Sequence, residues 1–79
     1  MDASFDKKIG KNISTIRQAK ELTQEQLSAR LQVQGCNLTR GALAKIEVGK
    51  RHLYPDEIAA LKTVLDCNYE DLFKNSDTN

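Results

Sequence analysis

The sequence predicts a single all-α domain, a compact arrangement of five helices. Apolar residues recur at helical spacing along the chain, no segment alternates with the two-residue period of a strand, and the sole proline stands where a helix can begin. A chain of 79 residues makes one domain with a modest aliphatic core. We expect this core to span about residues 6–74, between disordered ends.

The first two predicted helices are defined by spacing and by a start signal. Isoleucines at positions i, i+4 and i+7 share one face and predict a helix over about residues 6–20. Thr23 and Gln26 fit the reciprocal capping box, in which each side chain bonds the other's backbone N–H. A second helix therefore begins after Thr23 and runs to about Gln34, where Gly35 ends it.

The third predicted helix, about residues 40–48, has two unlike faces. Thr39 is the expected N-cap, and Gly49 is the residue that most easily ends the helix. Leu43 and Ile46 share an apolar face. The other face carries small and basic residues: Arg40, Gly41, Ala44 and Lys45. A small and basic face suits a helix that lies against a nucleic-acid groove.

Two shorter helices are predicted in the last third of the chain. Pro55 favours the start of a fourth helix, which carries apolar residues at helical spacing up to Leu65. Asn68 is the expected cap of a fifth helix that ends near Phe73. The polar residues 75–79 are expected to be frayed.

Positive charge is concentrated in the first two thirds of the chain. Residues 7–55 hold ten lysines and arginines against three acidic residues, a net charge of +7. Residues 56–79 hold two basic residues against six acidic ones, a net charge of −4. A polyanion would therefore meet the first part, where neutralised phosphates release counterions. Scattered solvated charges on helices give a similar pattern, so charge alone leaves both interpretations open.

Little in the sequence supports catalysis or metal binding. Cys36 and Cys67 are far apart and His52 is the only histidine, so we expect neither a metal site nor an activated thiol. Glu70 and Asp71 are acids of the kind favoured in the first turn of a helix. We therefore expect no enzyme, no cofactor and no small-molecule ligand. Without a membrane-length apolar run or a signal-peptide pattern, a cytoplasmic protein with no membrane partner is expected.

Three stretches of the chain carry motifs that occur together, in this order, in one family. They are residues 9–17 (IGKNISTIR), 22–29 (LTQEQLSA) and 43–51 (LAKIEVGKR). Together they resemble the Cro/phage-repressor-like helix-turn-helix family, over about residues 8–73. The resemblance implies a sequence-specific transcriptional regulator, expected to be a repressor, whose third helix enters the major groove of double-stranded DNA.

The resemblance also implies roles for individual residues. The base-contact positions hold Arg40, Gly41, Ala44 and Lys45. The phosphate-contact positions hold Gln24, Thr39, Lys50 and Arg51. Arg17 and Glu47 match the family's ion pair, which ties the first helix to the end of the third.

Several of these side chains have more than one possible role. Arg40 can bind O6 and N7 of a guanine together, or it can contact a phosphate. Lys45 either contacts DNA, as a base reader or at a phosphate, or only provides a solubilising charge. Ala42 and Ala44 either meet a thymine methyl group or only favour the helix. Gly41 either allows DNA to approach the backbone closely or marks a position that is not read.

The connection between the second and third helices is longer than in the compact form of the family. Residues 32–37 must extend the second helix or form a wider loop. Either solution replaces the tight turn of the compact form, so the angle between the two helices is left to the structure.

A domain this small reads few base pairs, so we expect two copies on a two-fold site. The acidic C-terminal helices, with Tyr69, Leu72 and Phe73, are the expected homodimer surface. The alternative to a DNA-binding regulator is a protein-interaction module of the same fold, such as an antitoxin-like or anti-repressor partner that binds a protein. A third possibility is a DNA-binding accessory of a mobile element or restriction system.

Overall fold

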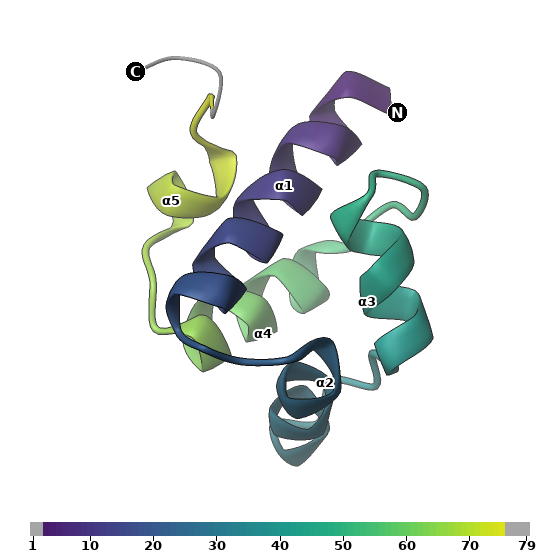
Figure 1. Ribbon diagram of the computed structural model, residues 1–79, viewed down its shortest axis with the longest axis vertical. Helices are drawn as coiled ribbons and strands as arrows, with labels where there is room; N and C mark the ends of the chain where they lie inside the picture. The colour runs from purple at the N-terminus through teal and green to yellow at the C-terminus, as the bar shows by residue number, and fades with distance from the viewer. Residues whose placement is uncertain (1–2, 76–79) are drawn as a thin grey trace.

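Five helices follow one another in the computed structural model, which describes residues 3–75 (Figure 1). They are α1 (Ala3–Ala19), α2 (Gln24–Val33), α3 (Arg40–Glu47), α4 (Pro55–Leu65) and α5 (Tyr69–Phe73). No strand occurs within residues 3–75, and the predicted all-α, five-helix class is confirmed. The expected fraying of residues 75–79 falls, apart from Asn75, outside the described residues.

The first helix begins earlier than the isoleucine spacing predicted. It starts at Ala3 instead of near residue 6. Phe5 accounts for the additional turn, since its ring packs against the core and stacks on the ring of Phe73, with 5.9 Å between the ring centroids. This contact joins the start of α1 to the end of α5, and only a tertiary neighbour provides it.

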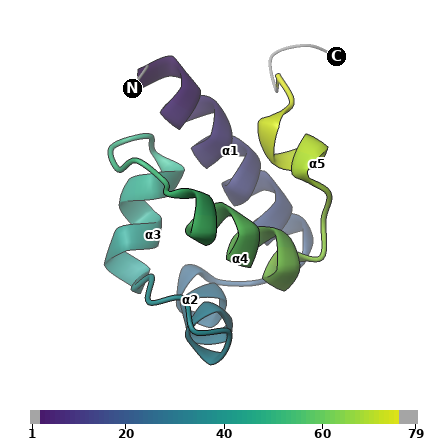
Figure 2. The same ribbon diagram turned by 180° about the vertical axis from the view of Figure 1, so that it is seen from behind.

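Helix α1 lies across the middle of the fold, with α3 on one side and α5 on the other (Figures 1 and 2). Helix α2 packs against both α3 and α4. The helices enclose one aliphatic core, as the low aromatic content predicted. Its buried residues are Ile9, Ile13, Leu22, Leu27, Leu31, Leu38, Leu43, Ile46, Leu53, Leu61, Leu65 and Leu72.

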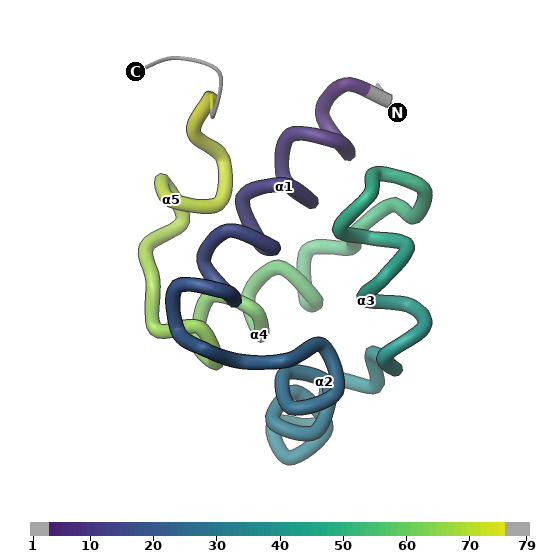
Figure 3. Tube along the Cα trace, viewed as in Figure 1, coloured from purple at the N-terminus to yellow at the C-terminus, as the bar shows by residue number. Residues whose placement is uncertain are grey.

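The additional residues between α2 and α3 are accommodated mainly by a longer α2. The helix continues to Val33, and Gly35 then turns the chain with a positive φ of 82°. The path from there to α3 is short, as the tube in Figure 3 shows. The buried hydroxyl of Ser28 donates a 2.7 Å hydrogen bond to the carbonyl oxygen of Leu38. This bond ties the end of the connection to the middle of α2.

Helix α5 is held by a buried amide that the sequence analysis missed. Asn12 is 2% exposed, and its Nδ2 donates hydrogen bonds of 2.8 Å to the carbonyl oxygens of Leu72 and Lys74. The prediction that Leu72 lies on a surface for a second copy is wrong, because its side chain is fully buried. Tyr69 and Phe73 do remain exposed, at 46% and 38%.

Candidate nucleic-acid interface

Helix α3 begins at the predicted cap and buries the predicted face. Thr39 has an extended backbone, and its Oγ1 accepts a 3.1 Å hydrogen bond from the N–H of Ala42. Leu43 and Ile46 are fully buried, at 0% and 1% exposure. These contacts orient the opposite face of α3 away from the core.

The outward face of α3 carries the predicted base-contact residues and one more. Arg40, Gly41 and Lys45 are exposed, and Ala44 is half-buried. Val48, at the C-terminal cap, is 59% exposed and follows Ala44 by four residues, so it continues the same face. The sequence analysis missed Val48, although its helical spacing from Ala44 was the signal that could have identified it.

Two shallow depressions flank this face and collect most of the predicted DNA-contacting residues. The first depression is lined by Thr39, Gly41, Ala42, Lys45, Lys50 and Arg51. The second is lined by Arg17, Thr23, Gln24, Glu25 and Arg40. Gly41 and Lys45 therefore lie together with Lys50, whereas Arg40 lies beside the start of α2. Ala44 lines neither depression.

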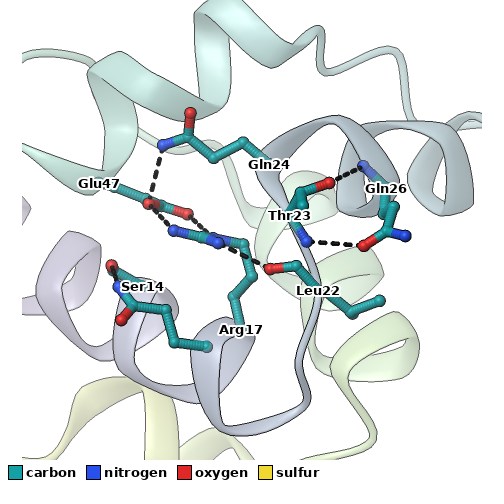
Figure 4. Close-up of polar contacts among 8 residues, drawn as sticks. Ser14, Arg17, Leu22, Thr23, Gln24, Gln26 and Glu47 are labelled. Carbon is teal, nitrogen blue, oxygen red and sulfur yellow. Dashed lines mark hydrogen bonds and ion pairs between the residues drawn. The ribbon is translucent and has the colours of Figure 1, made fainter.

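A cluster of polar side chains next to the second depression joins α1, α2 and α3 (Figure 4). Arg17 donates from Nε to Glu47 Oε2 at 2.7 Å and from Nη2 to Oε1 at 3.0 Å. Its Nη1 donates to the carbonyl oxygen of Leu22 at 2.7 Å. The two charged side chains are only 12% and 5% exposed, and hydrogen bonding to Glu47 raises the pKa of the Arg17 guanidinium, which stays charged.

Gln24, a predicted phosphate contact, is part of the same cluster. Its Nε2 donates a 3.0 Å hydrogen bond to Glu47 Oε1, so one of its two N–H groups points inward (Figure 4). Gln24 also lines the second depression. Its position thus couples the first turn of α2 to the end of α3.

The predicted capping box at the start of α2 is confirmed. The N–H of Thr23 donates to Gln26 Oε1 at 2.8 Å, and the N–H of Gln26 donates to Thr23 Oγ1 at 3.0 Å (Figure 4). The box fixes where α2 begins, and therefore where Gln24 and the helix N-terminus lie relative to α3.

Two glycines allow α1 to approach α3 and the connection that follows it. A Cβ atom at Gly10 would overlap the carbonyl oxygen of Ile46 and lie 3.1 Å from the carbonyl carbon and oxygen of Glu47. At Gly49, which has a φ of 78°, a Cβ would meet Lys7. The sequence analysis assigned no role to Gly10, although a glycine inside the isoleucine pattern of a helix was the available signal.

Arg51 reaches the first depression but is already paired. Its guanidinium donates two hydrogen bonds to the carboxylate of Glu57, in the first turn of α4. This pairing distinguishes Arg51 from Lys50, its exposed neighbour, and the sequence analysis had assigned both residues the same role.

Two cysteines lie within the described residues. Cys36 and Cys67 are free thiols, and burial is the main cause that raises the pKa of each. No group of three or more histidine, cysteine or acidic side chains that could hold a metal ion occurs within residues 3–75. In the same part of the chain, no helix combines the length and the apolar character needed to cross a membrane.

The order of the helices and the outward face of α3 define the helix-turn-helix class of DNA-binding domain. Residues 13–72 match the helix-turn-helix family model HTH_3, and the chain belongs to this family. Membership of this family places the chain in the class of DNA-binding transcription regulators. The resemblance to the Cro/phage-repressor-like family drawn from the sequence motifs is confirmed.

A solved structure shares both fold and sequence with this chain. It is the restriction-modification controller protein C.AhdI from Aeromonas hydrophila, with 30% sequence identity and a TM-score of 0.78. The similarity covers 90% of this chain and 96% of that one. A comparison with curated proteins found no match.

Proposed function

We propose that the chain binds a specific double-stranded DNA site and represses transcription by occupying it, with α3 in the major groove. The outward face of α3 is the observation that carries this proposal. Arg40 and Lys45 are exposed on it, while Leu43 and Ile46 anchor the opposite face in the core. A helix with its side chains is about 10–12 Å across, which matches a major groove about 12 Å wide.

The surroundings of α3 supply contacts for the DNA backbone. Lys50 shares the first depression with Gly41 and Lys45, so a phosphate beside the groove would meet an exposed ammonium group. Thr39 and Gln24 stand at the starts of α3 and α2, where free backbone N–H groups favour an anion. In this pose Arg40, in the first turn of α3, is the residue best placed for base readout.

Similarity to a restriction-modification controller supports a more specific role. At 30% identity over most of both chains, a regulator of a restriction-modification system is the biological setting that we propose. In this role two copies of the chain would bind a two-fold symmetric DNA site, because one small domain reads few base pairs. Analytical ultracentrifugation that showed a monomer both free and on DNA would exclude the two-copy arrangement.

Selection from random duplexes tests the proposal directly. The protein should enrich one sequence pattern, and its affinity for the selected duplex should fall steeply between about 50 mM and 200 mM salt. Absence of detectable binding at the lower salt concentration would refute DNA recognition. It would instead favour a protein-interaction module of the same fold.

Three alanine variants test which residues meet the DNA. Arg40→Ala should relax specificity at one position, with a loss of about 1–3 kcal/mol of discrimination, if its guanidinium reads a base. Lys45→Ala should weaken binding to the selected duplex. Lys20→Ala is the matched control, because Lys20 is exposed at the end of α1 and acts electrostatically on Cys67, near α5. Equal effects of Lys45→Ala and Lys20→Ala would contradict the proposed pose.

A further inference from the structure

Arg51, in the connection between α3 and α4, forms a bidentate ion pair with Glu57 in the first turn of α4. Arg51 Nη1 donates to Glu57 Oε1 at 2.9 Å, and Nη2 donates to Oε2 at 3.0 Å. Nη1 also donates to the carbonyl oxygen of His52 at 2.9 Å. Both side chains are partly buried, at 30% and 14% exposure. A guanidinium held by two parallel bonds has a defined orientation.

Glu57 also holds the start of α4. Its Oε1 accepts a 3.0 Å hydrogen bond from the backbone N–H of Tyr54, the residue before the helix. The hydrogen bond from Arg51 is the main cause that lowers the pKa of Glu57, so the carboxylate is charged at neutral pH. One carboxylate therefore joins the connection to the first turn of α4.

The opposite side of this connection rests on α1. Gly49 packs so closely on Lys7 that a Cβ atom would collide with it. His52 Nδ1 lies 3.4 Å from Asp6 Oδ1. The connection is thus held from both sides, by α1 on one and by the Arg51–Glu57 pair on the other.

Lys50 is an exposed basic residue in this connection. Its backbone N–H donates a 2.8 Å hydrogen bond to the carbonyl oxygen of Lys45, and its side chain lines the first depression beside α3. Arg51 follows it directly, so the bonds of the Arg51 side chain restrain the backbone beside Lys50.

Building on the proposed function, we propose that Arg51 is a positioning residue and not a phosphate ligand. Through its bidentate pairing with Glu57, it fixes the connection so that Lys50 meets a DNA phosphate. A phosphate that bound Arg51 would have to compete with a carboxylate that already neutralises the guanidinium, and the carboxylate would repel it. Arg51 therefore contributes to affinity through Lys50.

Whether Glu57→Gln weakens or strengthens DNA binding distinguishes a positioning role of Arg51 from a phosphate-ligand role. A positioning role predicts that Glu57→Gln weakens binding by about threefold to tenfold, because the charge-assisted pair is lost. A phosphate-ligand role predicts tighter binding, since the variant removes a negative charge near DNA and frees Arg51. The measurement is fluorescence anisotropy with the labelled duplex recovered by selection. Tighter binding by Glu57→Gln would overturn the inference.

Arg51→Lys gives a second discrimination that keeps the charge. Lysine cannot make two parallel bonds to a carboxylate, so a positioning role predicts that Arg51→Lys loses as much affinity as Arg51→Ala. A phosphate ligand would keep most of its contribution as lysine. Near-wild-type affinity of Arg51→Lys, with weak binding by Arg51→Ala, would overturn the inference.

A double-mutant cycle shows whether Arg51 acts through Lys50. We expect the variant with both Lys50→Ala and Arg51→Ala to lose little more affinity than Lys50→Ala alone, whereas Lys45→Ala and Arg51→Ala should combine additively. Additive losses for Lys50 and Arg51 would overturn the inference and leave the proposed function intact. If the wild-type protein selected no duplex, the proposed function and this inference would both fail.

Discussion

The close crossing of α1 and α3 makes Gly10→Ala the most informative substitution for stability. Gly10 is buried, and an added methyl group would overlap the carbonyl oxygen of Ile46. The carbonyl carbon and oxygen of Glu47, each 3.1 Å from the same point, close the remaining space. These atoms belong to the backbone of α3 and cannot rotate away, so the two helices must move apart.

Two opposing terms set the magnitude of this effect. Alanine favours a helix over glycine by about 1 kcal/mol. Overpacking a core costs about 1–3 kcal/mol or more, and separating two helices weakens many contacts together. The overlap with backbone atoms decides the balance, so we expect Gly10→Ala to be destabilising by about 2 kcal/mol. In a domain of this size, the melting temperature should fall by about 8–16 °C.

Urea unfolding followed by far-UV circular dichroism measures this loss, and Gly41→Ala is its matched control. Gly41 is exposed, and a Cβ there would meet only Thr39 Oγ1, at 3.9 Å. The same chemical change should therefore raise stability by about 0.5–1 kcal/mol. The reasoning would be refuted if Gly10→Ala unfolded at the same urea concentration as wild type, or at a higher one.

Three further predictions concern polar side chains and thiols. Asn12→Ala should lower the free energy of unfolding by about 1–3 kcal/mol, because two carbonyl groups of the α5 region lose their donor; an unchanged urea midpoint would contradict this. The pKa of Glu57 is lowered from 4.5 in the folded state, so its contribution to stability is present above that pH and is lost as the pH falls through the folded pKa. Glu57→Gln should accordingly show a smaller decrease in melting temperature between about pH 7 and pH 3 than wild type, and an equal decrease would contradict this. Burial raises the pKa of Cys36 and Cys67, so iodoacetamide at about pH 8 should modify both more slowly than free cysteine, as mass spectrometry can show, and urea should abolish the difference.

Most features that the sequence predicted are set by neighbouring residues, and the ion pair between Arg17 and Glu47, 30 residues apart, was implied only by the family resemblance. The caps at Thr23 and Thr39 involve partners only three residues away, so short motifs reveal them. The buried face of α3 follows from the spacing of Leu43 and Ile46 alone. The end of α2 near Gln34 was predicted from Gly35, whereas the path of residues 32–37 was left open because two solutions satisfied the same local pattern.

The features that the sequence did not predict depend on distant partners. The buried role of Asn12 requires carbonyl groups 60 and 62 residues further along the chain. The additional first turn of α1 depends on Phe73, and the pairing of Arg51 on an acid in another helix. Leu72 was assigned to the surface because a five-residue helix shows too little periodicity to distinguish its buried face.

The orientation of α3 follows from contacts at several points along it and not from the turn that precedes it. At its start, Ser28 holds the carbonyl of Leu38, so the path of residues 34–37 does not decide where α3 begins. At its end, Glu47 receives hydrogen bonds from α1 and α2, and the backbone of α1 touches the last turn at Gly10. Hydrogen bonds from Ser28 and Gln24 therefore hold the start and the end of α3 against α2, and neither bond involves residues 34–37. The orientation of α3 thus depends on contacts with α1 and α2 at both of its ends, and these contacts do not require a tight turn before it.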